Sequence, residues 1–366
     1  MSGRSPLRGP ASTTPTPRER GGAVADVAAP LARWLDRHVG AQGPWRSAPL
    51  AGGNSNETHL LRGGDGRRYV LRRPPRAAVS SSAHGVAREF RLLTALHGTA
   101  VPVPRPIALC EDPAVAGAPF LVMEHVGDAL SVTDTVPPGW AAHPGALTAA
   151  ADDLVDALAA LHRVDPAAVG LTGFGRPDGF LRRQPGRWYA QWEQTACRPL
   201  PAMGPLARWL TDRLPDASPT GLLHGDFHLD NCLFAAAAPR LRGVIDWELA
   251  TVGDPLLDVG LLLAFWGDRP CATVAMPAVQ GVSRLPGAPP REHLLDRYER
   301  ATGRPVGDLA YYRVLALYKL AAIVEGAYAQ YRSGVLDTPY AAALEHDVPA
   351  LLDEAMACAG LAVGRR

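Results

Sequence analysis

The sequence predicts an α+β fold in which a small lobe containing most of the strands is followed by a larger, mostly helical lobe. From residue 59 to residue 126, short apolar stretches typical of strands are separated by turns and by one helix. Beyond residue 128, apolar residues recur at helical spacing in several segments. One compact insert of loops and strands, 222–258, interrupts these helices and holds the unusual polar residues.

The small lobe is predicted to begin with a helix over 24–38, because Leu31, Leu35 and Val39 recur at helical spacing. The apolar stretch at 120–126 predicts a buried strand that ends at Gly127. The other elements predicted here are a Gly/Asn/Ser turn at 51–58, extended segments at 59–61 and 69–73, and a helix at 87–96.

In the larger lobe, Leu154, Leu158 and Leu161 fall on one face of a helix predicted at 152–162. Further helices are predicted at 188–192, 207–214, 292–302 and 311–331. We therefore predict three parts: a disordered tail (1–23), an N-terminal lobe (24–127) and a C-terminal helical lobe (128–366).

The composition predicts a cytoplasmic protein without a nucleic-acid or membrane partner. The formal net charge is only +1, so no general field attracts nucleic acid. Five cysteines without a CxxC pair favour reduced thiols over disulfides. The longest apolar run, 259–266, is too short to span a bilayer, and 1–22 contains no apolar stretch typical of a secretory signal. We expect a monomer or a homodimer.

Three polar residues of the insert have the types and the order that phosphoryl transfer requires. Asp226 is followed five residues later by Asn231, and Asp246 comes fifteen residues after Asn231. One carboxylate must accept or orient the proton of the attacking hydroxyl, while an amide oxygen and a second carboxylate hold Mg²⁺ against the phosphates. We expect Asp226 on a loop, with Asn231 and Asp246 on the flanking strands of a hairpin, so that the three converge.

An Asp and an Asn at this spacing are weak evidence by themselves, because both residues commonly cap turns. Here, however, His224 and Gly225 precede the Asp, and Ile-Asp-Trp-Glu (245–248) and Gly-Asp-Pro (253–255) follow. Turn chemistry alone does not account for so many ordered polar residues in apolar surroundings.

This stretch resembles the aminoglycoside phosphotransferase family, which has a two-lobed protein-kinase-like fold with an antiparallel sheet in its small lobe. Residues 223–231 resemble the catalytic loop of the family, and 244–258 resemble its magnesium-binding segment. The resemblance covers nearly the whole chain after residue 24, and it implies that the lobe 24–127 binds the nucleotide and that the lobe 128–366 carries the catalytic and magnesium-binding loops. The segments that resemble the subgroup associated with acyl-CoA dehydrogenases, whose members phosphorylate hydroxyacyl-CoA or have no assigned substrate, are 52–58, 69–75, 82–90, 101–104 and 119–124.

The resemblance implies that Asp226 is the catalytic base and that Asn231 and Asp246 are the magnesium ligands. It also implies that His224 supports the loop and that Asp258 ties the loop down through hydrogen bonds.

Three neighbouring residues allow other interpretations. Trp247 and Glu248 either face the acceptor or are a packed Trp and a surface Glu. His228, four residues after His224, suggests a zinc pair, but the Glu of such a motif is missing and the intervening Gly-Asp opposes a helix.

The resemblance also implies that ATP is the phosphoryl donor. The turn at 51–58 could present backbone N–H groups to phosphates, although it lacks the GxGxxG pattern of kinases. Arg72 occupies the strand position where kinases have a Lys, and its planar fork contacts phosphates differently from a point charge. Backbone groups at 123–126 would hold adenine. The residues predicted to bind the nucleotide are Ser55, Asn56, Arg72, Glu89, Glu124 and Val126.

We therefore expect an ATP- and Mg²⁺-dependent O-phosphotransferase that acts on a hydroxyl of a small molecule. The acceptor is either a hydroxy acid or hydroxyacyl thioester, as the subgroup suggests, or a natural product such as an antibiotic. Residues 268–340 are not noticeably acidic and contain eight arginines, which disfavours a polycationic aminoglycoside. The alternative is a catalytically impaired kinase-like binding or partner protein, supported by Arg72. A hydrolase is disfavoured because no Ser or Cys nucleophile lies in an elbow motif.

Overall fold

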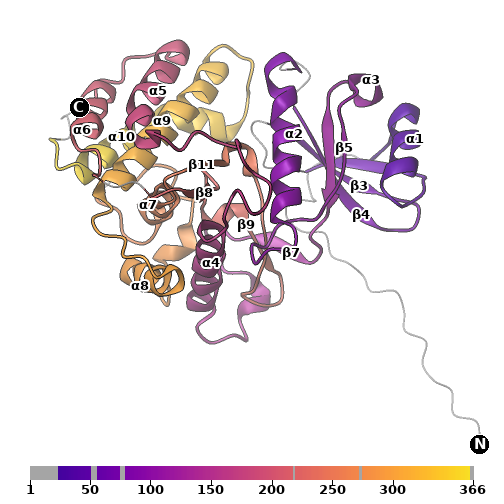
Figure 1. Cartoon of the computed structure of the whole chain (residues 1–366), viewed down its shortest axis with the longest axis horizontal. Helices are drawn as coiled ribbons and strands as arrows, with labels where there is room; N and C mark the ends of the chain where they lie inside the picture. The colour runs from indigo at the N-terminus through magenta and orange to yellow at the C-terminus, as the bar shows by residue number, and fades with distance from the viewer. Residues whose placement is uncertain (1–23, 51–55, 75–78, 217–218, 272–273, 363–366) are drawn as a thin grey trace, which may run out of the picture. The chain divides into compact units, whose positions relative to one another are not determined.

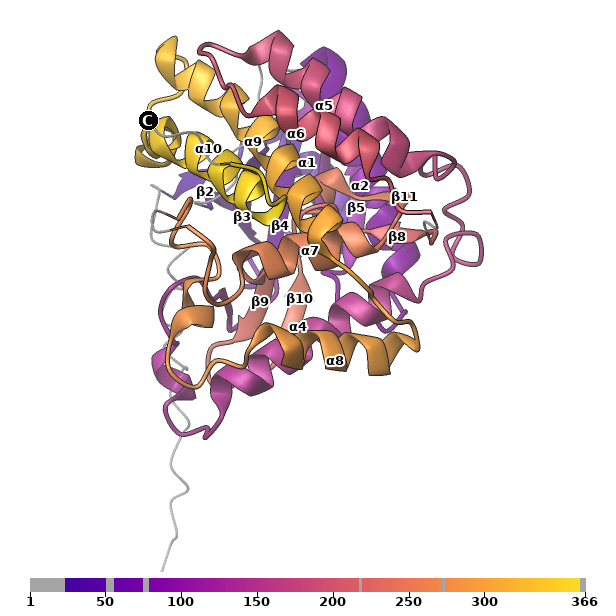
Figure 2. The ribbon, with the colours of Figure 1, turned by 90° about the vertical axis from the view of Figure 1, so that its left-hand side faces the viewer.

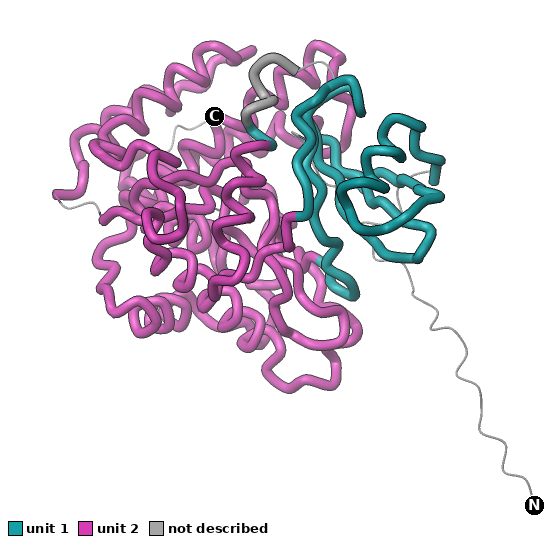
Figure 3. Tube along the Cα trace, turned by 45° about the vertical axis from the view of Figure 1, so that its right-hand side comes forward, with its two compact units in different colours: residues 1–86, 107–130 teal, residues 87–106, 131–366 magenta. Residues whose placement is uncertain are grey.

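The computed structural model describes residues 24–50, 56–74, 79–216, 219–271 and 274–362. It divides into two compact units, each formed by two stretches of the chain (Figure 3). Unit 1 contains the residues up to 86 together with 107–130, and unit 2 contains 87–106 together with 131–366. The predicted lobe boundary at 127/128 stays a prediction, because compactness alone does not define a domain. Ser55 lies outside the described residues.

Unit 1 is built on a six-stranded sheet in the order β1-β2-β3-β4-β6-β5 (Figure 1). The pairs β1–β2, β2–β3, β3–β4 and β4–β6 are antiparallel, as the predicted fold requires. The elements are β1 (Ala25–Asp26), α1 (Ala29–His38), β2 (Arg46–Pro49), β3 (Glu57–Arg62), β4 (Arg68–Arg73), β5 (Pro106–Cys110), α3 (Pro113–Ala116) and β6 (Phe120–Glu124).

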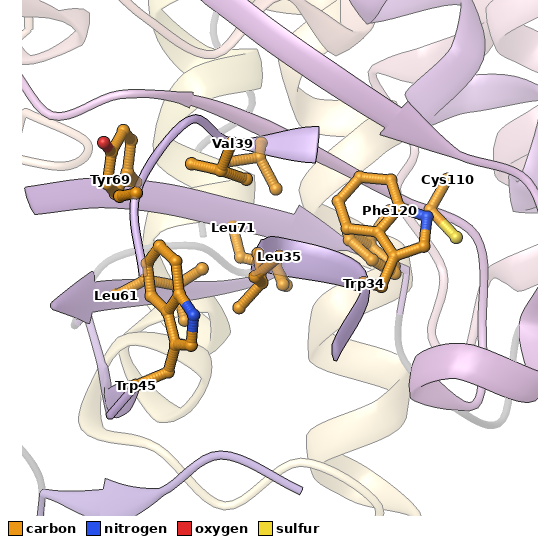
Figure 4. Close-up of a cluster of buried hydrophobic side chains, with 11 residues drawn as sticks. Trp34, Leu35, Val39, Trp45, Leu61, Tyr69, Leu71, Cys110 and Phe120 are labelled. Carbon is orange, nitrogen blue, oxygen red and sulfur yellow. The ribbon is translucent and has the colours of Figure 1, made fainter. Parts of the chain in front are cut away.

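The core of unit 1 is a cluster of apolar side chains between α1 and the sheet (Figure 4). Leu35 and Phe120 are fully buried, and the rings of Trp34 and Phe120 meet edge to face with centroids 4.9 Å apart. The helix predicted at 24–38 begins only at Ala29, because β1 takes up the preceding residues. A proline in its first turn suits this start, since a helix leaves that N–H unbonded.

Unit 2 is mostly helical, as predicted. Its long helix α9 (Ala310–Arg332) packs along α5, α7 and α10 (Figure 2). In α7 (Leu256–Phe265) nearly every residue is buried, because the helix is apolar on all sides. The other helices are α4 (Ala146–His162), α5 (Phe180–Thr195), α6 (Met203–Asp212), α8 (Arg291–Thr302) and α10 (Pro339–Cys358), and α2 (Val79–Leu96) crosses the division between the units.

Gly260 of α7 shows why two of these helices approach closely. A Cβ built on Gly260 would lie 2.6 Å from the carbonyl carbon of Tyr312 in α9, closer than real Cβ contacts allow. Glycine at this position therefore lets α9 pack directly against α7, the helix that follows the candidate site.

The insert predicted at 222–258 folds as two antiparallel pairs. β8 (Gly221–Leu223) pairs with β11 (Thr251–Gly253), and β9 (Cys232–Ala235) forms a hairpin with β10 (Leu241–Val244). A further strand, β7 (Ala129–Ser131), lies at the division between the units. No helix among the described residues is long and apolar enough to cross a membrane. The five cysteines are free thiols, as expected.

Candidate active site

The candidate catalytic loop runs from the end of β8 to the start of β9. Asn231 is the last residue of a short 3-10 helix, Leu229–Asn231, and Asp246 directly follows the segment after β10. The prediction that Asn231 and Asp246 lie on strands is therefore wrong. Asn231 directly precedes β9, and Asp246 follows β10 after one intervening residue. At Asp246 a left-handed conformation (φ 69°) ends the extended backbone. The Ile245 N–H still donates to the Asn231 carbonyl (2.9 Å), which keeps the two segments together.

Asp226 and Asn231 are joined directly. The Asn231 Nδ2 donates to the Asp226 backbone carbonyl (3.0 Å) and to its Oδ2 (3.2 Å). Because the amide nitrogen is used in this way, Oδ1 is the Asn231 atom left for a cation. An amide oxygen together with the nearby Asp246 carboxylate is a donor set that suits Mg²⁺, which takes few protein ligands and keeps waters and phosphate oxygens. The residues present thus fit the predicted ion.

Asp258, in the first turn of α7, fixes the start of the loop. Its Oδ2 accepts from the His224 N–H (2.7 Å) and its Oδ1 accepts from the Gly225 N–H (2.8 Å). The carboxylate is 1% exposed, so its bonds are made away from water. The hydrogen bonds expected of Asp258 are therefore confirmed. The imidazole of His162 approaches the same Oδ2 at 3.4 Å.

Gly225 needs the freedom of glycine for two reasons. Its φ is +84°, and a Cβ on it would lie 2.4 Å from the Leu249 carbonyl oxygen. Its own carbonyl accepts a hydrogen bond from the Lys319 Nζ of α9. Only glycine lets the loop take this left-handed turn between Leu249 and Lys319.

His224 connects the loop to the segment that carries Asp246. Burial lowers the pKa of His224, so the ring is neutral at physiological pH. Its Nδ1 then accepts from the Asp226 N–H (3.2 Å) while its Nε2 donates to the Ile245 carbonyl (2.9 Å). The side chain is fully buried, and its ring lies at a tilted angle beside that of Trp247, with centroids 4.5 Å apart. This arrangement supports a structural role for His224.

Asp226 lies among cations. The His228 Nε2 is 3.6 Å from the Asp226 Oδ2, and the His228 Nδ1 is 3.2 Å from the Asp230 Oδ2. Burial lowers the pKa of His228, but the two carboxylates outweigh burial and raise that pKa to about 10. Burial raises the pKa of Asp226, but His228 and Lys319 together bring it well below its usual range. Asp226 is therefore ionised.

Two residues that support the loop were missed by sequence reasoning. Lys319 contacts the Gly225 carbonyl and is only 8% exposed. Gln280 accepts from the Leu229 N–H through Oε1 (3.1 Å) and donates to the Leu262 carbonyl through Nε2 (2.8 Å). Lys319 could have been found, because it is the only lysine among the 37 basic residues of the chain. No comparable pattern marks Gln280.

A cavity of about 300 Å³ opens beside the loop within unit 2. Glu248 lines it, whereas Trp247 is 2% exposed and donates from Nε1 to the Val244 carbonyl (2.9 Å). Trp247 is thus a packed residue, whereas Glu248 lines the cavity. The lining residues are Arg88, Phe180, Gln184, Arg187, Trp188, Leu223, Gly225, Glu248, Leu249, Ala250, Thr251, Leu257 and Lys319.

The residues predicted to bind the nucleotide are spread over both units. Arg72 is buried in β4 of unit 1 (6% exposed), and Glu89 is buried in α2 within unit 2 (3% exposed). Asn56 directly precedes β3, Glu124 is the exposed last residue of β6, and Val126 follows two residues later. The pairing of Arg72 with Glu89, and the nucleotide contacts of all these residues, stay predictions.

Comparison with known proteins decides the family. The model of the phosphotransferase enzyme family matches residues 47–311. The chain belongs to this family. Among curated proteins, human acyl-CoA dehydrogenase family member 11 is 35% identical over 314 residues, which is 83% of this chain and 39% of that protein. Probable acyl-CoA dehydrogenase IBR3 of Arabidopsis thaliana is 33% identical over 306 residues, 77% of this chain and 36% of that protein.

The chain thus spans less than two fifths of the length of these two relatives. The chain is also similar to a solved structure from Ralstonia eutropha that is described as a candidate aminoglycoside phosphotransferase. The two are 32% identical with a TM-score of 0.73, over 90% of this chain and 97% of that one. A macrolide 2'-phosphotransferase type I, 24% identical with a TM-score of 0.57, covers 93% of this chain and 100% of its own and shares the fold. The predicted kinase-like α+β fold and the resemblance to the aminoglycoside phosphotransferases are confirmed.

Proposed function

We propose that the chain is an ATP- and Mg²⁺-dependent O-phosphotransferase for a small molecule. The observation that carries this proposal is the Asp226–Asn231 contact, with Asp246 held next to it across the end of the hairpin. A carboxylate that can take a proton and two oxygen donors for magnesium are thereby gathered within one rigid set of loops. Membership of the phosphotransferase family supports the same chemistry.

In the proposed reaction the acceptor hydroxyl donates a hydrogen bond to Asp226, which turns the oxygen toward the γ-phosphorus of ATP. The new O–P bond forms as the bond between the γ-phosphorus and the bridging oxygen of ADP breaks. Because the lowered pKa makes Asp226 a weak base, it takes the proton as the attacking oxygen loses basicity. The products are a phosphate monoester and ADP. Magnesium held by Asn231 and Asp246 would offset the phosphate charge.

For the acceptor, we propose a hydroxy acid or its thioester rather than an antibiotic. The curated relatives are acyl-CoA dehydrogenase family members. Residues 268–340 contain nine basic and seven acidic residues, so this part of unit 2 lacks the excess of carboxylates that suits a polycation. A second candidate, a catalytically impaired binding protein, rests on Arg72 in place of the kinase lysine.

The test uses the full chain with ATP, with and without Mg²⁺. Thermal shift reports nucleotide binding, and ADP release with a panel of hydroxy acids, acyl thioesters and antibiotics reports transfer. We expect stabilisation by ATP that needs the metal and turnover that needs an acceptor. Binding without turnover on any acceptor would favour the impaired protein, and the absence of both would exclude the phosphotransferase.

A further inference from the structure

The cavity beside the catalytic loop carries more positive than negative charge. Arg88, Arg187 and Lys319 line it, and Glu248 is the one carboxylate among the lining residues, which leaves a formal excess of two positive charges. The remaining walls are largely apolar, with Phe180 among them. A volume of about 300 Å³ lies at the lower end of the roughly 300–1,000 Å³ typical of small-molecule pockets.

Backbone carbonyls, not carboxylates, accept the hydrogen bonds of two of these cations. Arg88 donates to the Ala250 carbonyl (2.8 Å) and lies over the ring of Phe174 at 3.6 Å. Lys319 donates to the Gly225 carbonyl. None of the three forms an ion pair with a carboxylate in the described part of the chain.

Arg187 and Lys319 face the same space without a shared counter-ion. Arg187 is exposed on α5 with its guanidinium 4.7 Å from the ring centre of Trp188, and Lys319 lies 5.6 Å from the same ring. Burial lowers the pKa of Lys319, and Arg187 lowers it further, although Asp226 and Asp258 act in the opposite direction. Two positive charges that face the same ring and line the same cavity favour the binding of an anion between them.

We infer that this cavity is the acceptor pocket and that Arg187, with Arg88 and Lys319, selects acceptors that carry an anionic group. The inference rests on the proposed function, because it assigns the acceptor side of the same reaction. Gly225, next to the proposed base, lines the cavity, so an acceptor bound there would have its hydroxyl close to Asp226. The apolar wall would hold its carbon chain. The anionic group is either the carboxylate of a free hydroxy acid or a phosphate of its coenzyme A thioester.

The test compares Arg187→Gln with the wild-type chain and with Arg182→Gln, a control on the same helix that is exposed and does not line the cavity. Each protein is given a hydroxy acid, its coenzyme A thioester and its neutral methyl ester. In Arg187→Gln we expect kcat/KM for the charged acceptors to fall about tenfold or more, because a hydrogen bond to a charged group is lost. In Arg187→Gln, kcat/KM for the methyl ester and the KM for ATP should stay unchanged. The control Arg182→Gln should have the wild-type kcat/KM for all three acceptors. The charged acceptor whose kcat/KM falls most shows whether the pocket binds a carboxylate or a phosphate.

The inference is overturned if Arg187→Gln lowers kcat/KM for acid, thioester and ester alike, or raises only the KM for ATP. In the latter case the cavity would bind nucleotide phosphates. Calorimetric titration of the acid and the thioester separates this result from a failure of the proposed function. If the wild-type chain binds an anionic acceptor more tightly than Arg187→Gln does, yet transfers no phosphate, the assignment of the pocket is supported and the proposed function is contradicted. If the wild-type chain binds neither compound, the assignment of the acceptor pocket is contradicted.

Discussion

Two kinds of interaction stabilise two regions of the molecule: polar contacts hold the candidate catalytic loop of unit 2, and apolar packing holds the core of unit 1. Buried polar side chains from three separate segments, Asp258, Gln280 and Lys319, hold the loop by its backbone. In unit 1, apolar side chains such as Leu35 and Phe120 pack between α1 and the sheet. Hydrogen bonds are directional and fix atomic positions, whereas apolar burial has no direction and mainly supplies stability. Substitutions in the two regions should therefore separate activity from stability.

The largest effect is expected from Asp226→Asn, which keeps the shape of the side chain and removes the proposed base. Because general-base catalysis contributes about 10²–10⁴-fold, we expect kcat to fall about 10³-fold, or ~4 kcal/mol of barrier. Stabilisation by ATP and Mg²⁺ should persist, since Asp226 is not one of the proposed ligands. Acceptor-dependent ADP release measures the first quantity and thermal shift the second.

The matched control for this prediction is Asp156→Asn, which changes an exposed carboxylate of α4 and should leave turnover unchanged. A kcat of Asp226→Asn within tenfold of the wild-type value would remove Asp226 from the role of base.

Leu35→Ala should have the next largest effect, on stability rather than on catalysis. Leu35 is fully buried, and truncation of such a side chain costs about 3 kcal/mol through lost burial and the cavity left behind. Hydrogen exchange followed by mass spectrometry should show faster exchange in peptides of α1, β3 and β4. Peptides that cover 221–265 should exchange as in the wild type, as should all peptides of the control Val335→Ala, which alters an exposed residue. Equally faster hydrogen exchange in the peptides of both units would contradict the proposed contrast between the apolar core of unit 1 and the polar contacts of the loop.

The same contrast explains which features the sequence predicted. Helices and strands followed from apolar periodicity, and the predicted fold was confirmed. The boundaries were less accurate, because the helix expected at 24–38 begins at Ala29 and the one expected at 188–192 extends from Phe180 to Thr195. In the latter, the polar and charged residues Arg182, Arg183 and Gln184 conceal a helix that tertiary packing against α9 supports.

In the candidate site, the residues proposed from the sequence lie within one short segment, whereas supporting residues from distant segments were missed. Asp226, Asn231 and Asp246 lie within 21 positions of one another, so their chemistry and order showed in the sequence. Gln280 reaches the loop over 51 positions and Lys319 over 94. Contacts at such separations depend on how the helices pack, which no local pattern specifies.

Asp258→Asn tests whether the polar anchors fix the loop. An Asn can offer one carbonyl oxygen where the carboxylate offers two, so it must leave either the His224 N–H or the Gly225 N–H facing an NH₂ group. Losing one charge-assisted bond costs about 2 kcal/mol. We expect faster hydrogen exchange at 224–231 and a kcat lower by about tenfold, while unit 1 peptides exchange as before. Normal turnover in Asp258→Asn would show that the loop keeps its geometry without this anchor.

The smallest effect is expected from Arg297→Ala, which removes polar contacts that are exposed rather than buried. The Arg297 guanidinium of α8 lies 2.6 Å from Asp156 and 3.1 Å from Asp152 of α4, and water reaches all three side chains. Exposed pairs contribute about 0–1 kcal/mol and are screened by salt, so the loss in unfolding free energy should be below about 1 kcal/mol and should shrink further in 1 M NaCl. Denaturant titration at two salt concentrations measures it, and kcat should not change. The contacts of Arg297 with Asp156 and of Asp258 with the loop have similar distances and differ mainly in their access to water. A tenfold loss of kcat in Arg297→Ala would therefore show that the α4–α8 contact also positions the loop and that burial is not what distinguishes Asp258.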